Sequence, residues 1–187
     1  MKLLLYCTKA KPYLFKNPTD VINQFIKDYW CADKLDEKPF DEDILNGKIV
    51  AECDFEVERL QIVYGKGWET KTIKGTENIE KLTCLSRDEL YQYCKGNGYA
   101  IHIKNLHVFN EPRDLEDYED EWEYPLERAP QNMRRCYSTL YSNIEADMPI
   151  RTDSYILISI RPEWLCKILN GEKTIEVRKK VLKEMLE

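Results

Sequence analysis

The most constraining feature of the sequence is the stretch GKIVAECDFEVERL at residues 47–60, in which apolar and charged side chains alternate. Ile49 and Ala51 fall on one side of an extended chain and Glu52 and Asp54 on the other, because successive side chains of a strand point to opposite faces. The pattern predicts a strand with one face in the core and one acidic face in solvent. The chain is therefore expected to fold around a sheet.

Further segments carry strand and helix patterns. Short apolar or alternating runs predict strands at residues 2–7, 99–109 and 155–160, with another short strand after Gly171. Helical spacing and capping signals predict helices within 17–30, from Ser86, and from Pro162 to Gly171. Short strands mixed with a few helices predict an α+β fold, and the simplest arrangement is a small mixed β-barrel flanked by helices.

Three polar segments separate these elements. Residues 64–82 are rich in Gly, Lys and Thr and are typical of a hairpin or a mobile loop. Residues 111–128 are strongly acidic and predict a solvated loop or a short irregular segment. Residues 138–153 are polar without a sustained period and predict a linker. We interpret residues 1–187 as a single domain.

Charge and cysteine content limit the function. The 187 residues have a formal net charge of −6 at pH 7, whereas binding nucleic acid over the whole surface needs a basic excess that neutralises phosphates. A local basic pocket stays open as an alternative. Seven cysteines without a CxxC pair and only two histidines do not predict a zinc site or a disulfide framework. We expect free buried thiols, no metal or other cofactor, no membrane segment and a cytoplasmic location.

The stretch YILISIRPEWLCKILNGEKTIEVRKK at residues 155–180 resembles the opening of the ASCH family, a branch of the PUA-like barrels. That opening is a strand, a helix that starts at Lys/Arg-Pro-Glu, and a strand with the pattern Gly-x-Lys-Thr-x-Glu-x-Arg. The last pattern is matched here by Gly171, Lys173, Thr174, Glu176 and Arg178. Segments within residues 1–137 resemble the later parts of the family, so the resemblance covers most of the chain and implies a PUA-like barrel.

The order of these segments is rotated relative to the family. The strand-helix-strand unit that opens the family comes last here, at residues 154–187, after the predicted linker 138–153. We interpret this order as a circular permutation, which is tolerated because domain termini often lie close together. Two alternatives stay open: residues 155–187 complete the barrel of a neighbouring molecule in a domain-swapped homodimer, or the chain is a piece of a tandem array.

The charged strand after Gly171 carries the main candidate site. Lys173 and Glu176 are the candidate catalytic residues, for proton chemistry with mutually perturbed pKa values. Arg178 is a candidate for binding a phosphate or a base edge. Regular alternation places Glu176 and Arg178 on one face and Lys173 on the other, and the resemblance implies a bend after Gly171 that turns Lys173 inward. The alternative is a solvated strand with ordinary surface ion pairs.

Further candidate ligand-binding residues follow buried strands or open a helix. Ser159 and Arg161 lie beside a helix N-terminus, which favours anions. Thr8 and Lys9 follow the first predicted strand, and Gln131 lies where relatives place polar residues beside the cavity. For each residue the alternative is an ordinary structural position at a helix entry, a strand end or a loop.

Three functions follow from these residues. The first is a PUA-like module that binds RNA, a modified nucleoside or a nucleotide in a polar cleft, by stacking and hydrogen bonds to base edges. The second is an amidohydrolase or nuclease acting on that ligand. Some ASCH-type proteins deacetylate acetylcytidine with Lys, Thr and Glu, and Glu176 stands where we align the catalytic Thr. The third is a protein-interaction module, of phage or mobile-element origin, that uses the acidic segment 111–124.

Overall fold

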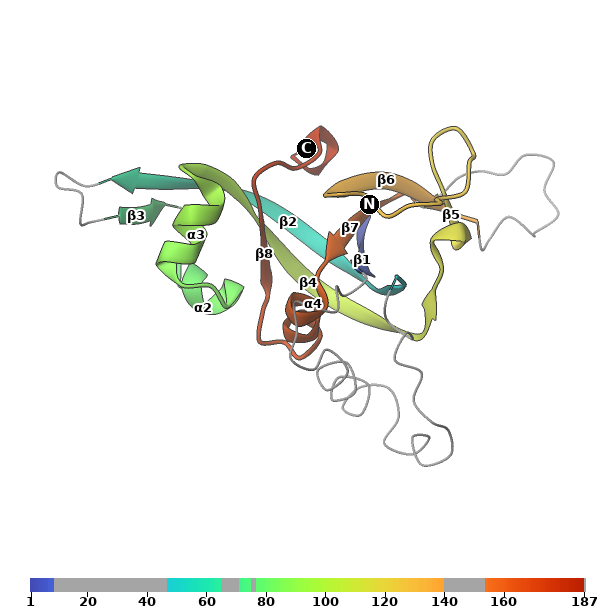
Figure 1. Cartoon of the computed structure of the whole chain (residues 1–187), viewed down its shortest axis with the longest axis horizontal. Helices are drawn as coiled ribbons and strands as arrows, with labels where there is room; N and C mark the ends of the chain where they lie inside the picture. Colours follow the sequence, from blue (N-terminus) through green and yellow to red (C-terminus); the bar gives the residue numbers. More distant parts are fainter. Residues whose placement is uncertain (9–46, 65–70, 75–76, 140–153, 187) are drawn as a thin grey trace, which may run out of the picture. The chain divides into compact units, whose positions relative to one another are not determined.

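The computed structural model describes residues 1–8, 47–64, 71–74, 77–139 and 154–186 (Figure 1). These residues form a mixed α+β fold that is mostly sheet. The chain divides into two compact units: unit 1 comprises Met1–Cys53 and Leu106–Asn170, and unit 2 comprises Asp54–Asn105 and Gly171–Glu187. Two long strands contribute residues to both units. The helix predicted within 17–30 and the candidate Lys9 lie outside the described residues.

Unit 1 contains a mixed sheet. Its strands are β1 (Lys2–Cys7), the start of β2 (Ile49–Tyr64), the end of β4 (Asn97–Arg113), β5 (Tyr118–Glu119), β6 (Met133–Ser138) and β7 (Ser154–Ile160). β1 is parallel to β7 and antiparallel to β2, and β6 is antiparallel to β7 and β5. Leu3, Leu4 and Leu5 are fully buried, since β1 lies between two strands and is covered on both faces. The strands predicted at 2–7 and 155–160 are confirmed.

Unit 2 contains a second group of strands and two short helices. Its elements are the rest of β2, β3 (Lys71–Lys74), α2 (Ile79–Thr83), α3 (Arg87–Cys94), the start of β4, β8 (Ile175–Arg178) and a 3₁₀ turn at Lys183–Met185. β3 pairs antiparallel with β2, as the hairpin prediction requires, and β8 pairs antiparallel with β4. The loop prediction for 64–82 missed α2, because its five residues are too few to show a helical period.

The helix ends follow the capping signals in the sequence. Ser86 and Glu89 form the predicted capping box at the start of α3. In unit 1, α4 (Pro162–Leu169) starts with its proline in the first turn, where a missing backbone N–H costs nothing. Gly171 follows the end of α4 with a φ of 74°, a left-handed conformation that glycine adopts without strain. The turn at Gly171 precedes β8.

The strand order supports a coarser description of the fold than the predicted barrel. The hydrogen-bonded order is β5-β6-β7-β1-β2-β4-β8, with β3 added beside β2. Within the part of the chain that the structure describes, no strand pairing joins β5 to β8. The structure therefore has an open mixed sheet with helices, rather than a closed barrel.

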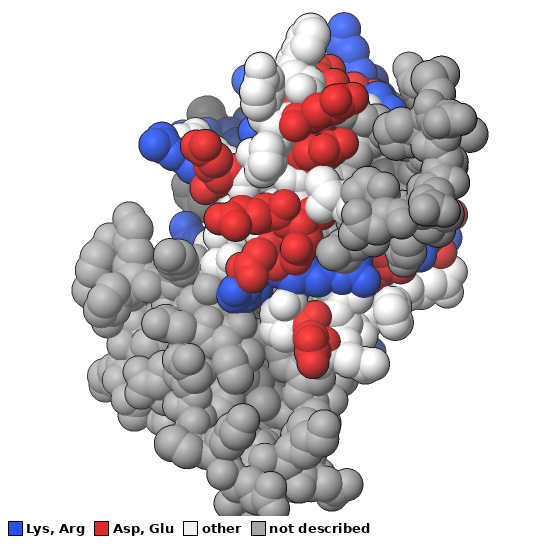
Figure 2. Space-filling model, turned by 90° about the vertical axis from the view of Figure 1, so that its right-hand side faces the viewer, with Lys and Arg blue, Asp and Glu red and all other residues white. Residues whose placement is uncertain are grey.

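The acidic segment 111–128, predicted as a solvated loop or a short irregular segment, is irregular in part and also contains short regular elements. β4 continues into the segment as far as Arg113, a 3₁₀ turn follows at Leu115–Asp117, and β5 comes next. Tyr118 and Leu126 are buried in the core of unit 1, and as isolated apolar residues among charges they show no recognisable period. Figure 2 looks at the end of the molecule that carries β5 and shows Asp and Glu side chains gathered on this surface.

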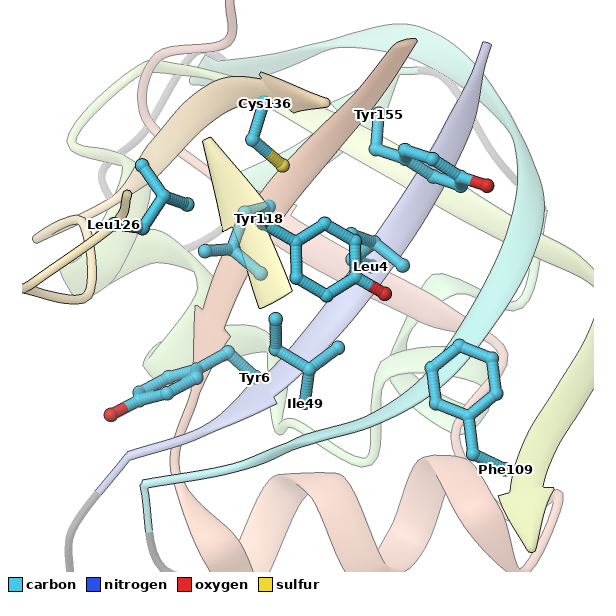
Figure 3. Packing of buried hydrophobic residues seen from close by; sticks show 9 residues of the cluster. Leu4, Tyr6, Ile49, Phe109, Tyr118, Leu126, Cys136 and Tyr155 are labelled. Carbon is cyan, nitrogen blue, oxygen red and sulfur yellow. The ribbon is translucent and has the colours of Figure 1, made fainter. Parts of the chain in front are cut away.

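Each unit has its own apolar cluster. In unit 1 the rings of Tyr118 and Tyr155 meet edge to face with centroids 6.0 Å apart, and neighbouring strands supply the other members (Figure 3). These are Leu4, Tyr6, Ile49, Phe109, Leu126, Cys136 and Leu157. The cluster of unit 2 consists of Leu60, Ile79, Leu90, Cys94, Ala100, Ile175 and Val177. Helices α2 and α3 therefore pack on the strands β4 and β8.

The cysteines of the described segments are free, and five of the six are buried. Burial raises the pKa of Cys7 and Cys136 to about 12 and that of Cys166 to about 11. These thiols are therefore protonated and unreactive at neutral pH. Within the segments that the structure describes, no helix is both long and apolar enough to cross a membrane.

Candidate ligand-binding site

The strand β8 brings three charged side chains of the predicted site together in unit 2. Ile175 and Val177 of β8 belong to the apolar cluster of the unit. The side chain of Lys173, just before the strand, is 2% exposed, and those of Glu176 and Arg178 are 12% exposed. These three residues, named the β8 ion cluster from here on, are largely withdrawn from water rather than spread over a solvated strand.

Lys173 makes the most buried polar contacts of the β8 ion cluster. Its Nζ donates a hydrogen bond to the Thr83 carbonyl at 3.0 Å and lies 3.3 Å from Glu176 Oε2. Burial lowers the pKa of Lys173, while the negative charge and hydrogen bond of Glu176 act in the opposite direction. Regular strand alternation places Lys173 and Glu176 on opposite faces. The contact between their side chains therefore fits the bend that we expect after Gly171.

Glu176 is shared by two cations. Its Oε2 faces Lys173, and its Oε1 lies 3.0 Å from Arg178 Nε. With Lys173 protonated, the β8 ion cluster holds two positive charges and one negative charge. Two cations and one carboxylate are therefore held together in a partly desolvated setting.

The C-terminal end of α2 holds the chain before β8 in place. The Thr174 N–H donates to the Leu82 carbonyl at 3.0 Å, and Cys84 Sγ donates to the Glu172 carbonyl at 3.4 Å. The Thr83 carbonyl that Lys173 contacts lies in the last turn of α2, where helix carbonyls have no partner within the helix. Lys173 therefore caps α2 while it pairs with Glu176.

An aromatic ring and further cations lie beside the end of β8. A Cβ at Gly98 of β4 would lie 2.7 Å from Cys94 Sγ and 3.3 Å from the Arg178 carbonyl oxygen. Glycine at this position therefore allows α3 and β8 to approach β4 closely. Tyr93 of α3 is 40% exposed, and the ammonium of Lys179 lies 5.2 Å from its ring centroid. An exposed ring thus stands next to the basic end of β8.

The other described candidates form a separate group in unit 1, around the end of β7. Ser159 Oγ donates to the Pro130 carbonyl at 2.6 Å, next to Gln131, and the Ser159 N–H donates to the Asn132 carbonyl at 3.3 Å. The Thr8 N–H donates to the Ile160 carbonyl at 2.9 Å.

Arg161, the N-cap residue of α4, is exposed and lies 3.9 Å from the Glu163 carboxylate. Ser159 itself is buried, and its hydroxyl serves to fix the neighbouring loop. The structure thus gathers Thr8, Ser159, Arg161 and Gln131 in one unit and the β8 ion cluster in the other.

The acidic face of β2 is paired with basic or polar side chains. Glu52 Oε1 lies 2.5 Å from Lys2 Nζ and 3.8 Å from His107 Nδ1 in unit 1. In unit 2, Glu56 lies 2.5 Å from Lys104 Nζ, and Asp54 accepts a hydrogen bond from the Asn105 side chain at 2.7 Å. Partnerships of this type are ordinary cross-strand pairs, so these contacts do not indicate a second reactive site.

The sequence did not indicate Thr83 or Tyr93 as parts of the candidate site. Thr83 contributes a backbone carbonyl, which any residue type could supply, and it lies 90 positions from Lys173 along the chain. Tyr93 lies in the capping-box helix α3, whose strongest sequence signal concerns its start. Of these candidate-site residues, Lys173, Glu176 and Arg178 are the ones whose side-chain types indicate a charged site.

Comparison with known proteins gives no match: no family model, no curated protein and no solved structure resembles the chain at a significant level. Among the residues that the structure describes, no group of three or more His, Cys, Asp or Glu side chains is arranged to hold a metal ion. The geometry of the β8 ion cluster therefore provides the indication of function.

Proposed function

We propose that this protein binds a nucleotide, either free or as the exposed end of an RNA, at the basic end of β8. The observation that carries the proposal is the β8 ion cluster, in which Lys173 and Arg178 share the single carboxylate of Glu176 in a largely buried setting. An incoming phosphate adds negative charge beside these two cations. Arg178 is suited to that contact because a guanidinium binds phosphate through two parallel hydrogen bonds.

Fold stability alone is a weak explanation for the β8 ion cluster. Buried ion pairs contribute little net stability, because the cost of desolvating the charges offsets their attraction. Ionisable groups with perturbed pKa values are more frequent at functional sites. The lowered pKa of the buried Lys173 and its grouping with Glu176 and Arg178 support a binding role.

The ring of Tyr93 supports a nucleotide rather than a bare anion. It is exposed and lies beside Lys179, so a base stacked on this ring brings its phosphate towards the cations of β8. Stacking of bases on aromatic side chains, together with electrostatic contacts to the phosphate, is the usual way in which proteins hold unpaired nucleotides.

We also propose that the sheet derives from a PUA-like ASCH barrel with circularly permuted segments. The succession β7, α4, β8 and the residues Gly171, Lys173, Glu176 and Arg178 support this origin. A domain-swapped homodimer is the alternative arrangement of the same segments. Measurement of the mass in solution by light scattering separates a permuted monomer from a swapped dimer.

Catalysis is the second candidate function, and binding is better supported. A deacetylase of the Lys-Thr-Glu type needs a hydroxyl nucleophile next to the lysine. The Thr83 hydroxyl donates to the Ile79 carbonyl of its own helix at 2.7 Å, and Thr174 is exposed whereas Lys173 is buried. The lowered pKa of Lys173 is the observation that favours an enzymatic role.

A thermal-shift screen with nucleosides, nucleoside monophosphates and short RNAs tests the proposal. A ligand that binds only the folded state stabilises it by RT ln(1 + L/Kd), where L is the free ligand concentration, so the melting temperature rises with the ligand concentration. We expect nucleoside monophosphates to stabilise the wild-type protein, nucleosides to do so less, and Arg178→Gln to abolish the shift. The matched control Lys183→Gln removes an exposed cation outside the cluster and should keep the shift.

Three outcomes contradict the proposal. They are no stabilisation by any nucleotide or RNA, an equal shift in wild type and Arg178→Gln, or an equal loss in Arg178→Gln and Lys183→Gln. Hydrolysis of acetylcytidine that is lost in Lys173→Met favours the enzyme instead.

A further inference from the structure

A second unusual surface lies in unit 1, in the turn that connects β5 to the next segment. Trp122 and Tyr124 are 72% and 69% exposed, which makes them the most exposed large aromatic residues in the part of the chain that the structure describes. An exposed residue of this kind is common singly, but two within three positions form a local apolar contact surface. We name residues 119–125 the aromatic turn.

The aromatic turn has a defined conformation. One oxygen of the buried Asp120 carboxylate accepts hydrogen bonds from the Trp122 and Tyr124 N–H groups at 2.9 and 3.1 Å. The other oxygen accepts from Arg134 at 2.6 Å. The Asp120 N–H in turn donates to the Tyr124 carbonyl at 2.9 Å. The two rings are therefore carried on a fixed backbone rather than on a flexible loop.

The base of the aromatic turn is anchored in the core of unit 1. The Leu126 N–H donates to the Tyr118 carbonyl at 2.8 Å, and both side chains are buried. The Tyr118 hydroxyl accepts from Arg113 at 3.0 Å. Because the turn is preorganised, a partner that contacts it spends little free energy on ordering it.

The charge around the two rings is negative. Glu119, Glu121 and Glu123 alternate with or flank the aromatic residues, and Glu121 and Glu123 are exposed. Figure 2 shows carboxylates gathered over this end of the molecule. Such a surface repels phosphates and attracts cations, and the faces of Trp and Tyr rings also bind cations. The chemistry therefore fits a basic partner and opposes a nucleic acid.

We propose that the aromatic turn docks a Lys- or Arg-rich segment of a partner protein. Trp122 and Tyr124 contact the side-chain stems and cationic groups of that segment, and the surrounding glutamates pair with its charges. Trp and Tyr are the residues that most often dominate protein interfaces, and complementary charge increases the association rate. This surface is distinct from the β8 ion cluster, whose charge has the opposite sign.

Fluorescence anisotropy with a labelled Lys/Arg-rich peptide tests the proposal. We expect the peptide to bind the full chain in a salt-dependent manner. The double variant Trp122→Ala/Tyr124→Ala should weaken binding by about tenfold or more. The double variant Glu121→Gln/Glu123→Gln should weaken it less and reduce the salt dependence. Since these side chains are exposed, the variants should keep the melting temperature of the wild type.

The matched control removes the same charge elsewhere. Glu111→Gln/Glu184→Gln changes two exposed carboxylates outside the aromatic turn and should leave peptide binding within about twofold of wild type. The proposal is overturned by no peptide binding to the wild type, by unchanged binding to Trp122→Ala/Tyr124→Ala, or by equal losses in the two glutamate variants. It is also overturned by a short RNA whose affinity falls in the aromatic variant while that of the basic peptide does not.

Discussion

The β8 ion cluster and the aromatic turn depart from the usual distribution of side chains in opposite directions. The first withdraws Lys173, Glu176 and Arg178 from water, and the second presents Trp122 and Tyr124 to water. Buried charges and exposed large aromatic residues are the observations that carry information, because exposed charges and buried apolar residues need no explanation. The comparison therefore separates two regions, for which we propose an anionic and a cationic ligand, respectively.

The two regions also differ in how their acidic residue is used. In the β8 ion cluster Glu176 pairs with Arg178 of its own strand and with Lys173, which precedes the strand. In the aromatic turn the Asp120 carboxylate accepts hydrogen bonds from two backbone N–H groups and from Arg134, and these bonds fix the turn. The glutamates around Asp120 then give the surface its negative charge. The carboxylate of the first region thus pairs with two cations, whereas that of the second region holds the backbone of a turn.

The largest effect on this comparison is expected from Glu176→Gln. The change leaves Lys173 and Arg178 as two buried cations without their shared counter-charge, and should lower the free energy of unfolding by roughly 3–5 kcal/mol. Urea denaturation measures this loss. The control Glu80→Gln breaks the exposed pair with Arg87 and should cost less than about 1 kcal/mol. Equal effects of the two changes would show that the cluster is solvated.

Asp120→Ala should have the next largest effect. It removes the acceptor of the Trp122 and Tyr124 N–H groups and the partner of Arg134, at an expected cost of about 1–3 kcal/mol. Hydrogen exchange followed by mass spectrometry should show faster exchange in residues 118–126, with little change in unit 2. The control Glu121→Ala should leave this exchange unchanged. Unaltered protection after Asp120→Ala would contradict the scaffold role.

The pH dependence of stability distinguishes the buried lysine from surface charges. Because burial lowers the pKa of folded Lys173 below its unfolded value, the unfolded state binds more protons between the two pKa values. Lys173 therefore contributes more stability as the pH rises through this window towards the unfolded pKa, and less as the pH falls.

Denaturation of wild type and Lys173→Met across this alkaline range measures the effect, since other titrating groups are common to both proteins. The free energy of unfolding of the wild type, relative to that of Lys173→Met, should increase as the pH rises. A constant difference would show that the lysine is not shifted by burial.

The smallest effect on stability is expected from the exposed rings. Trp122→Ala/Tyr124→Ala should change the free energy of unfolding by no more than about 0.5 kcal/mol, because both side chains are mostly solvated. Thermal denaturation measures this change. A loss above about 2 kcal/mol would mean that the rings pack in the fold and are not a docking surface.

Local patterns in the sequence predicted the helices and strands, whereas the candidate sites depend on contacts between residues that are far apart in the chain. The apolar run of β1, the capping box of Ser86 and Glu89, and Pro162 at the start of α4 were visible because each depends on neighbouring residues. Whether the sheet closes into a barrel could not be predicted, since strand pairing between distant segments leaves no local pattern. The predicted linker is partly tested: Ser138 ends β6, and residues 140–153 lie outside the described segments.

The candidate site was predictable in its residue types and not in its contacts. The dense charges after Gly171 indicated Lys173, Glu176 and Arg178, but alternation alone separated Lys173 from the other two. The contact between Lys173 and the Thr83 carbonyl depends on how α2 packs on the start of β8. Similarly, the acidic composition of 111–128 concealed the fixed turn around Asp120, because the hydrogen bonds that build it use backbone groups.

The most direct test of the account is the dissociation constant of a nucleoside monophosphate, measured by isothermal titration calorimetry on three proteins. These are the wild type, Arg178→Gln and the control Lys183→Gln. If the β8 ion cluster holds the phosphate, Arg178→Gln weakens binding by about tenfold or more, since a charged hydrogen bond contributes about 1.5–3 kcal/mol, and Lys183→Gln stays within about twofold of wild type. Equal affinity of the wild type and Arg178→Gln would contradict the central claim.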